Sequence, residues 1–73
     1  MKINQQYEYL FKKSKNGYLY PITKWIYLYF NKDYSYNGVV MFYSNTYFTS
    51  ISKQEDYLLN LLLTKNILML EGE

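Results

Sequence analysis

The chain has 73 residues and a net charge of +2, and it contains no histidine, cysteine or arginine. These absences exclude disulfide bonds, zinc sites built from thiolate or imidazole ligands, and catalysis of the Ser-His-Asp or Cys-His type. The length and an apolar content of 49% fit a single compact domain over residues 1–73. Residues 1–10 hold no secretory apolar segment, and the longest apolar runs, such as residues 25–30, are far shorter than the roughly 20 residues of a membrane helix. We therefore expect a cytoplasmic protein without a membrane span.

Residue types with AT-rich codons dominate the composition. Phe, Tyr, Met, Ile, Asn and Lys make up more than half of the chain, whereas Gly, Ala, Arg and Pro are scarce. This bias indicates an AT-rich genome, such as that of a low-GC bacterium or of the phages and mobile elements that it carries. Part of the tyrosine excess can be explained in the same way.

The first predicted element is an amphipathic helix over residues 4–15. Its apolar positions follow helical spacing, with Asn4 as N-cap, lysines in the last turn and Gly17 as a left-handed C-cap. The alternative is a hairpin in which Asn16 and Gly17 form a two-residue turn between two strands. The lysines favour the helix.

Extended segments follow. Residues 18–22 are interrupted by Pro21, which places them at a sheet edge or a strand start. Residues 24–31 have the β-branched and aromatic composition of a strand, and both of its faces are apolar. We expect this strand to be central in its sheet or to be covered on both faces.

Turn-forming residues then divide the chain into a meander. The segment 31–38 reads NKDYSYNG and predicts a hairpin that leads into a strand over residues 39–43. A second turn at residues 44–45 would lead into a strand over residues 47–51. These segments predict a three-stranded antiparallel sheet.

The C-terminal part predicts a long helix. Residues 52–55 have the form of a capping box, in which Ser52 and Glu55 each satisfy a backbone N–H, and a leucine-rich segment follows. Residues 67–70 form either a last strand or a continuation of this helix. The predicted fold class is α+β, with an N-terminal helix, the three-stranded sheet, the C-terminal helix and the last strand.

The ionisable residues offer little for catalysis. The carboxylates are few, and Glu55 and Asp56 fit the first turn of the predicted helix, where they favour its dipole. The three glycines are isolated, so no phosphate-binding loop is present. We expect a protein that is not an enzyme and that uses no cofactor or metal.

The eleven tyrosines are the main candidates for a binding surface. Eight of them form four Tyr-x-Tyr pairs, and a chain of this size cannot bury all of its aromatic rings. Interfaces concentrate Tyr and Trp, and Tyr combined with Asn and Ser is typical of adaptable binding loops. The predicted partner-binding residues are Trp25, Tyr27, Tyr29, Lys32, Asp33, Tyr34, Tyr36 and Asn37.

Two alternatives remain for these rings. Tyr34 and Tyr36 could fold back onto the sheet, and the row of Trp25, Tyr27 and Tyr29 could form a second core layer under the N-terminal helix.

The predicted function is a small protein-binding inhibitor from a phage or mobile element. It would occupy a surface of a host protein or protein–nucleic acid complex in the host cytoplasm, and an anti-CRISPR-like protein is its most concrete form. A homodimer is an alternative assembly, because a second copy could cover the leucine-rich helix or an open sheet edge. The alternative function is single-stranded nucleic-acid binding by lysines and tyrosines of a sheet. The small net charge and the lack of Arg disfavour it.

Overall fold

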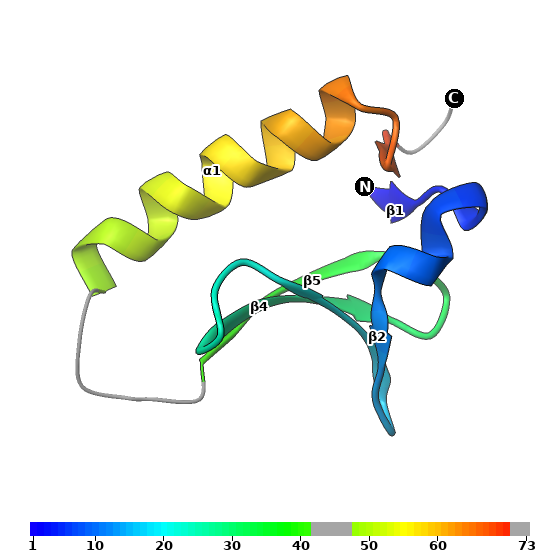
Figure 1. Ribbon diagram of the computed structural model, residues 1–73, viewed down its shortest axis with the longest axis horizontal. Coiled ribbons are helices and arrows are strands. Elements are labelled where there is room, and N and C mark those ends of the chain that lie inside the picture. The colour runs from blue at the N-terminus through cyan, green and yellow to red at the C-terminus, as the bar shows by residue number, and fades with distance from the viewer. Residues whose placement is uncertain (42–47, 71–73) are drawn as a thin grey trace.

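The computed structural model describes residues 1–41 and 48–70. In chain order the elements are strand β1 (Lys2–Ile3), the 3-10 helix η1 (Gln5–Leu10), strands β2 (Lys12–Lys13), β3 (Gly17–Pro21), β4 (Ile26–Asn31) and β5 (Tyr36–Met41), helix α1 (Phe48–Thr64) and strand β6 (Leu68–Met69). Strands β2 to β5 form a four-stranded antiparallel sheet in the order β2-β3-β4-β5, and β1 pairs with β6 in a separate two-stranded sheet. Helix α1 extends over one face of the larger sheet (Figure 1).

The hydrophobic core lies between α1 and the inner face of the four-stranded sheet. Antiparallel pairing places Tyr18 opposite Phe30 and Tyr20 opposite Leu28, so these side chains share that face. Phe30 and Leu28 are fully buried, and Leu62 of α1 is 1% exposed. Phe11 closes one side of the core, where its ring meets Phe30 edge-on at 5.4 Å. The two-stranded sheet contributes Ile3 and Leu68.

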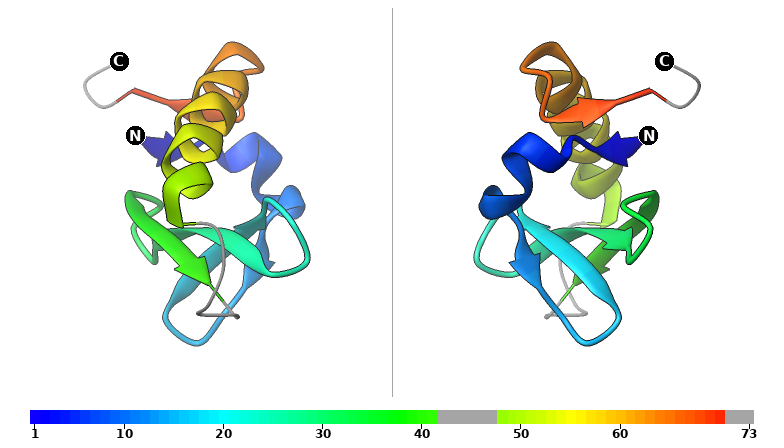
Figure 2. Two further views of the ribbon diagram at one scale, coloured as in Figure 1. Left: turned by 90° about the vertical axis from the view of Figure 1, so that its left-hand side faces the viewer. Right: turned by 90° about the vertical axis from the view of Figure 1, so that its right-hand side faces the viewer.

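The N-terminal strand fastens the two sheets together. The N–H of Ile3 donates to the carbonyl of Tyr34 at 2.9 Å, and the N–H of Tyr36 donates to the carbonyl of Met1 at 2.8 Å. Both views in Figure 2 show α1 and the β1–β6 pair on the same side of the four-stranded sheet. Within the described part of the chain, no element covers the opposite face.

The predicted N-terminal α-helix is wrong. Residues 5–10 form a 3-10 helix of six residues, with Asn4 as its N-cap, and residues 12–13 form strand β2. A continuous helix would keep Lys12 and Lys13 out of the sheet, whereas strand pairing aligns them with Leu19 and Tyr18 and lets Phe11 reach the core. Burial of Phe11 together with backbone pairing outweighs a weak local helix propensity.

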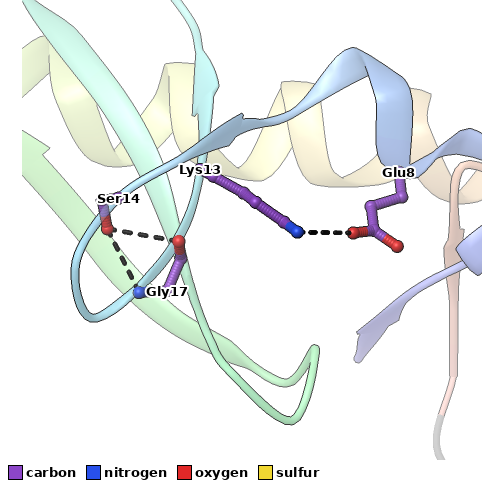
Figure 3. Close-up of polar contacts among 4 residues, drawn as sticks. All are labelled: Glu8, Lys13, Ser14 and Gly17. Atoms are coloured by element: carbon purple, nitrogen blue, oxygen red, sulfur yellow. Dashed lines mark hydrogen bonds and ion pairs between the residues drawn. The ribbon is translucent and has the colours of Figure 1, made fainter.

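The alternative hairpin is closer to the structure, but its turn is displaced by one residue. The N–H of Ser14 donates to the carbonyl of Gly17 at 2.8 Å. Figure 3 shows the Ser14 hydroxyl, which donates to the same carbonyl at 3.2 Å and accepts from the N–H of Gly17 at 3.1 Å. Lys15 and Asn16 therefore occupy the turn, and neither has a positive φ. Figure 3 also shows Lys13 reaching toward Glu8, with 4.0 Å between Nζ and Oε1.

The predicted three-stranded sheet is also wrong. The expected pairing of residues 24–31 with residues 39–43 is present as β4 and β5, but β2 and β3 extend the sheet to four strands. Residues 48–51, predicted as a strand, are the first turn of α1. Ser52 therefore lies within the helix and does not cap it. The predicted turn at residues 44–45, and Tyr47, lie outside the described residues.

A C-terminal helix is present as α1, and of the two alternatives for residues 67–70 the structure contains the strand, β6. Asn66 ends the helix with a φ of 61°, and the N–H of Ile67 donates to the carbonyl of Leu62 while that of Asn66 donates to Leu63. This pair of bonds is the Schellman arrangement, here with Asn in place of the more usual Gly. The reversal directs Leu68 back toward the core beside Ile3.

Candidate functional surface

The outer face of the four-stranded sheet is the candidate binding surface. We define it as the face opposite α1, carried by Lys12, Leu19, Tyr27, Tyr29 and Val40. Strand pairing aligns Lys12, Leu19 and Tyr29 across three strands, and Tyr27 lies opposite Val40. Leu19, Tyr27, Tyr29 and Val40 are all half-buried, because they pack beside one another without a covering layer in the described part of the fold.

Tyr29 is held in place by its neighbours. Its hydroxyl donates to the carbonyl of Asn16 at 2.8 Å, and its ring lies against the buried Gly17. On the other side its partner is Gly38, which has no side chain to shield the ring. Tyr29 is therefore a fixed ring that lies across the sheet surface.

Two lysines of this region lie over aromatic rings. Lys12 Nζ is 5.8 Å from the ring centroid of Tyr27, and Lys24 Nζ is 4.7 Å from that of Trp25. Both distances fall within the range of cation–π attraction. Positive charge and aromatic surface therefore occur together here.

Trp25 lies in the turn between β3 and β4, and 42% of its surface is exposed. Thr23 shapes this turn, since its Oγ1 accepts hydrogen bonds from the N–H groups of Trp25 and Ile26 at 3.1 and 3.2 Å. The threonine hydroxyl thus serves as acceptor for two backbone N–H groups at this turn. The exposed indole is thus carried on a turn with a defined conformation.

The turn between β4 and β5 forms a second group of predicted site residues. Lys32, Asp33 and Asn37 are exposed. The hydroxyl and N–H of Ser35 both donate to Asp33, and these bonds hold the pKa of that carboxyl below its usual range. Asp33 and Tyr34 also line an open hollow of about 640 Å³, together with residues of β1 and β6.

Tyr34 has an unusual backbone, with a φ of 72°, a region that residues other than Gly and Asn rarely adopt. Its ring stacks on Tyr18 at 5.1 Å with an interplanar angle of 21°. A hydrogen bond with Tyr34, burial and the nearby Glu8 raise the pKa of the Tyr18 hydroxyl. Tyr34 is therefore largely a packing residue.

Tyr36 belongs to the inner face. Its ring centroid is 5.4 Å from that of Phe30, and its hydroxyl donates to the carboxylate of Glu55 on α1. Burial, and to a lesser extent the charge of Asp56, raise the pKa of Glu55. Of the eight predicted residues, Tyr27 and Tyr29 lie on the outer face and Trp25 lies in the turn before β4, whereas Tyr34 and Tyr36 pack against Tyr18 and Phe30.

The prediction missed Lys12, Leu19, Val40 and Gly17. Side chains alternate between the two faces of a strand, so the pattern of residues 18–20 and 39–41 would have indicated that Leu19 and Val40 lie on the face opposite the core. Lys12 is one of the lysines of the nucleic-acid alternative, but the predicted helix over residues 4–15 kept it out of the sheet. The role of Gly17 depends on its closeness to β4, which the sequence does not encode locally.

Charge is unevenly distributed along the chain. Residues 9–32 contain five lysines (Lys12, Lys13, Lys15, Lys24 and Lys32) and no acidic residue. Among the described carboxylates, Glu55 and Asp56 lie on α1, across the core from the outer face. Two carboxylates border this basic stretch, since Glu8 lies 4.0 Å from Lys13 and Asp33 follows Lys32. Helix α1 carries Lys53 together with Glu55 and Asp56.

Residues 1–41 and 48–70 contain no group of three or more potential metal-ligating side chains, and none of their helices is long and apolar enough to cross a membrane. Comparison with known proteins finds no family model, no curated protein and no solved structure that matches this chain.

Proposed function

We propose that the chain is a non-enzymatic binding protein that acts by occupying a surface of another macromolecule with the outer face of its sheet. The observation that carries this proposal is that α1 covers one face of the four-stranded sheet, while no described element covers the other face. Helix α1 lies on the inner side of the sheet (Figure 2). Leu19, Tyr27, Tyr29 and Val40 are half-buried on the other face, which no described element covers. An apolar, aromatic surface of this kind marks an interaction site in small proteins.

The local structure of this face favours binding. Tyr29 is fixed by its bond to Asn16, and the Trp25 turn is shaped by Thr23. Rings that are already ordered lose little conformational entropy when a partner covers them. Such rings are suited to serve as anchors.

The most concrete form of the proposal is an inhibitor carried by a phage or mobile element, which blocks a host defence protein or protein–nucleic acid complex in the manner of an anti-CRISPR protein. Its support is the AT-rich composition, the short chain and the absence of His, Cys and Arg. In this form the protein needs only to cover a surface that the host protein uses.

The test is capture of a partner from the lysate of a low-GC bacterium, by the wild type and by two matched variants. The double variant Trp25→Ser/Tyr27→Ser alters the outer face, and Tyr57→Ser alters a tyrosine of α1 that is 67% exposed. We expect a partner that the wild type and Tyr57→Ser both retain and the outer-face variant loses, with all three melting within a few degrees of one another. Equal retention by all three proteins would refute the outer face as the binding surface.

A further inference from the structure

We infer that the outer face binds single-stranded nucleic acid, either free or exposed on a protein complex. The inference rests on the proposed function, because it takes the outer face as the binding surface, and it adds the chemistry of the partner. It is carried by aromatic rings and lysines that the fold gathers on one side of the sheet, away from the acidic groups of α1.

The first feature that a single-strand site requires is a set of aromatic rings on which bases can stack. Tyr27 and Tyr29 are two residues apart on β4, so their side chains share a face at a separation of roughly 6.6 Å. Trp25 lies in the turn that precedes β4 and is 42% exposed. Neighbouring aromatic side chains on a sheet can each stack one base, and stacking tolerates any base because every base has a π-face.

The lysines supply the second element. Lys12 lies over Tyr27 and Lys24 over Trp25, so each cation is beside a ring on which a base would stack. Lys32 follows the far end of β4, and Lys15 lies in the neighbouring turn between β2 and β3. Positive charge therefore flanks the row of rings at both ends and along the β2 side.

The dimensions suit a short extended strand. The backbone from Lys24 to Lys32 spans roughly 26 Å if it is extended throughout. This length accommodates roughly four nucleotides, at the low end of the known site sizes for single strands. The phosphates would follow the lysines while the bases lie on the rings.

A single strand fits this face better than an acidic protein surface does. Carboxylates alone would pair with the lysines but would make no stacking contact with aromatic side chains. Duplex DNA keeps its bases stacked on one another and cannot offer them to rings on a flat sheet. A single strand satisfies both features, since its charge repeats along the chain and its bases are exposed.

Net charge alone does not oppose this assignment. The sum of +2 includes the carboxylates of α1, whereas residues 9–32 carry five positive charges and no negative one. The lack of Arg removes bidentate reading of guanine, so we expect little preference for base sequence. The site would hold its ligand by stacking and phosphate attraction.

The test uses fluorescently labelled DNA and RNA of about ten nucleotides, which exceeds the proposed site, and an abasic oligonucleotide of equal length and charge. With about three phosphates neutralised, the log–log salt slope should be about −2, so affinity should fall roughly 15- to 20-fold between about 50 and about 200 mM salt. The abasic chain and duplex DNA should bind markedly more weakly. Equal binding of the abasic chain would overturn the stacking role.

Variants separate stacking from charge. Tyr27→Ile keeps an apolar side chain suited to a strand but removes the ring, and it should weaken binding by roughly fivefold or more, whereas Tyr27→Phe should bind as the wild type does. Lys12→Gln should lower the steepness of the salt slope by about 0.7, and Lys65→Gln, at the end of α1, should leave it unchanged. The Lys12 variant keeps the test valid if a ring variant fails to fold. An unchanged slope for Lys12→Gln would place the ligand elsewhere.

The two proposals can fail separately. If a partner depends on the outer face, withstands nuclease treatment of the lysate, and no oligonucleotide binds, the partner is a protein surface, so the proposed function holds while the present inference is wrong. If oligonucleotides bind but Tyr27→Ile and Lys12→Gln do not alter binding, the outer face is not the nucleic-acid site and the present inference is wrong. The proposed function also fails only if the outer-face variant retains the captured partner as the wild type does.

Discussion

Gly17 lies so close to β4 that a Cβ atom on it would be 2.1 Å from the carbonyl oxygen of Phe30. No side chain can occupy that position without movement of the β3 or β4 backbone, since real Cβ contacts are longer than 3.0 Å. The same closeness leaves room for the ring of Tyr29 to lie over Gly17 and to bond with Asn16. A missing side chain in one strand thus positions an aromatic ring of the candidate surface.

Replacement of Gly17 by alanine should destabilise the fold by about 1–3 kcal/mol, because an atom is forced into occupied space between paired strands. Chemical denaturation of the variant and the wild type measures the loss. The control is Asn16→Ala, in the adjacent exposed turn, where only the backbone carbonyl is used and the change should stay within about 0.5 kcal/mol. Equal stability of Gly17→Ala and the wild type would mean that β3 and β4 are farther apart than described.

Tyr36 should behave as a core residue. Tyr36→Ala removes a ring packed on Phe30 and should lower the free energy of unfolding by about 2–4 kcal/mol. Tyr36→Phe keeps the packing and removes only the hydroxyl that bonds to Glu55, so it should cost about 1 kcal/mol.

A double-mutant cycle with Tyr36→Phe and Glu55→Gln isolates the contact between the sheet and α1. If the effects of the two variants simply add, the hydroxyl and the carboxylate do not interact in solution.

Stability should depend on pH through Glu55. Burial raises the pKa of this carboxyl above its usual value of 4.5, so the folded state holds the proton more tightly than the unfolded chain. The resulting stabilisation is complete below pH 4.5 and is lost as pH rises through the folded-state pKa. Asp33 has a lowered pKa, so its contribution is present above its usual value of 3.8 and is lost only at lower pH.

Melting temperatures measured between about pH 4 and pH 7 should therefore fall more steeply for the wild type than for Glu55→Gln, whose side chain cannot ionise. Asp56→Asn, which removes the neighbouring charge but keeps the burial of Glu55, should retain most of the dependence. Parallel profiles for the wild type and Glu55→Gln would contradict the assignment.

Asn66 should tolerate glycine better than alanine. Its φ of 61° requires a left-handed conformation, which glycine adopts without strain and alanine does not. Asn66→Gly should keep or slightly raise stability, whereas Asn66→Ala should lower it by about 1 kcal/mol. Thermal unfolding measures both variants. The control is Thr64→Ala, at the last residue of α1, where φ is not positive. This variant also removes the hydrogen bond from the Thr64 hydroxyl to the carbonyl of Asn60.

The candidate surface could be predicted in part. Because side chains alternate along a strand, the sequence placed Tyr27 and Tyr29 on one face of residues 24–31, and both tyrosines do share the outer face. It could not decide whether that face was covered, because the expected cover was an N-terminal helix that does not form. Tyr34 and Tyr36 are equally close in sequence but play packing roles, since the turn and the register of β5 direct them to Tyr18 and Phe30.

The sequence by itself determined the period-two segments, the turn after β4, the helix rich in leucine and the lack of catalytic residue types, because each depends on residues that are near one another in the chain. Tertiary structure decided the rest. Pairing of β2 with β3 overrode a local helix signal, since it allowed Phe11 to be buried. Placement of α1 on one face left the rings and lysines of the other face together, and that separation arises from packing between segments distant in sequence.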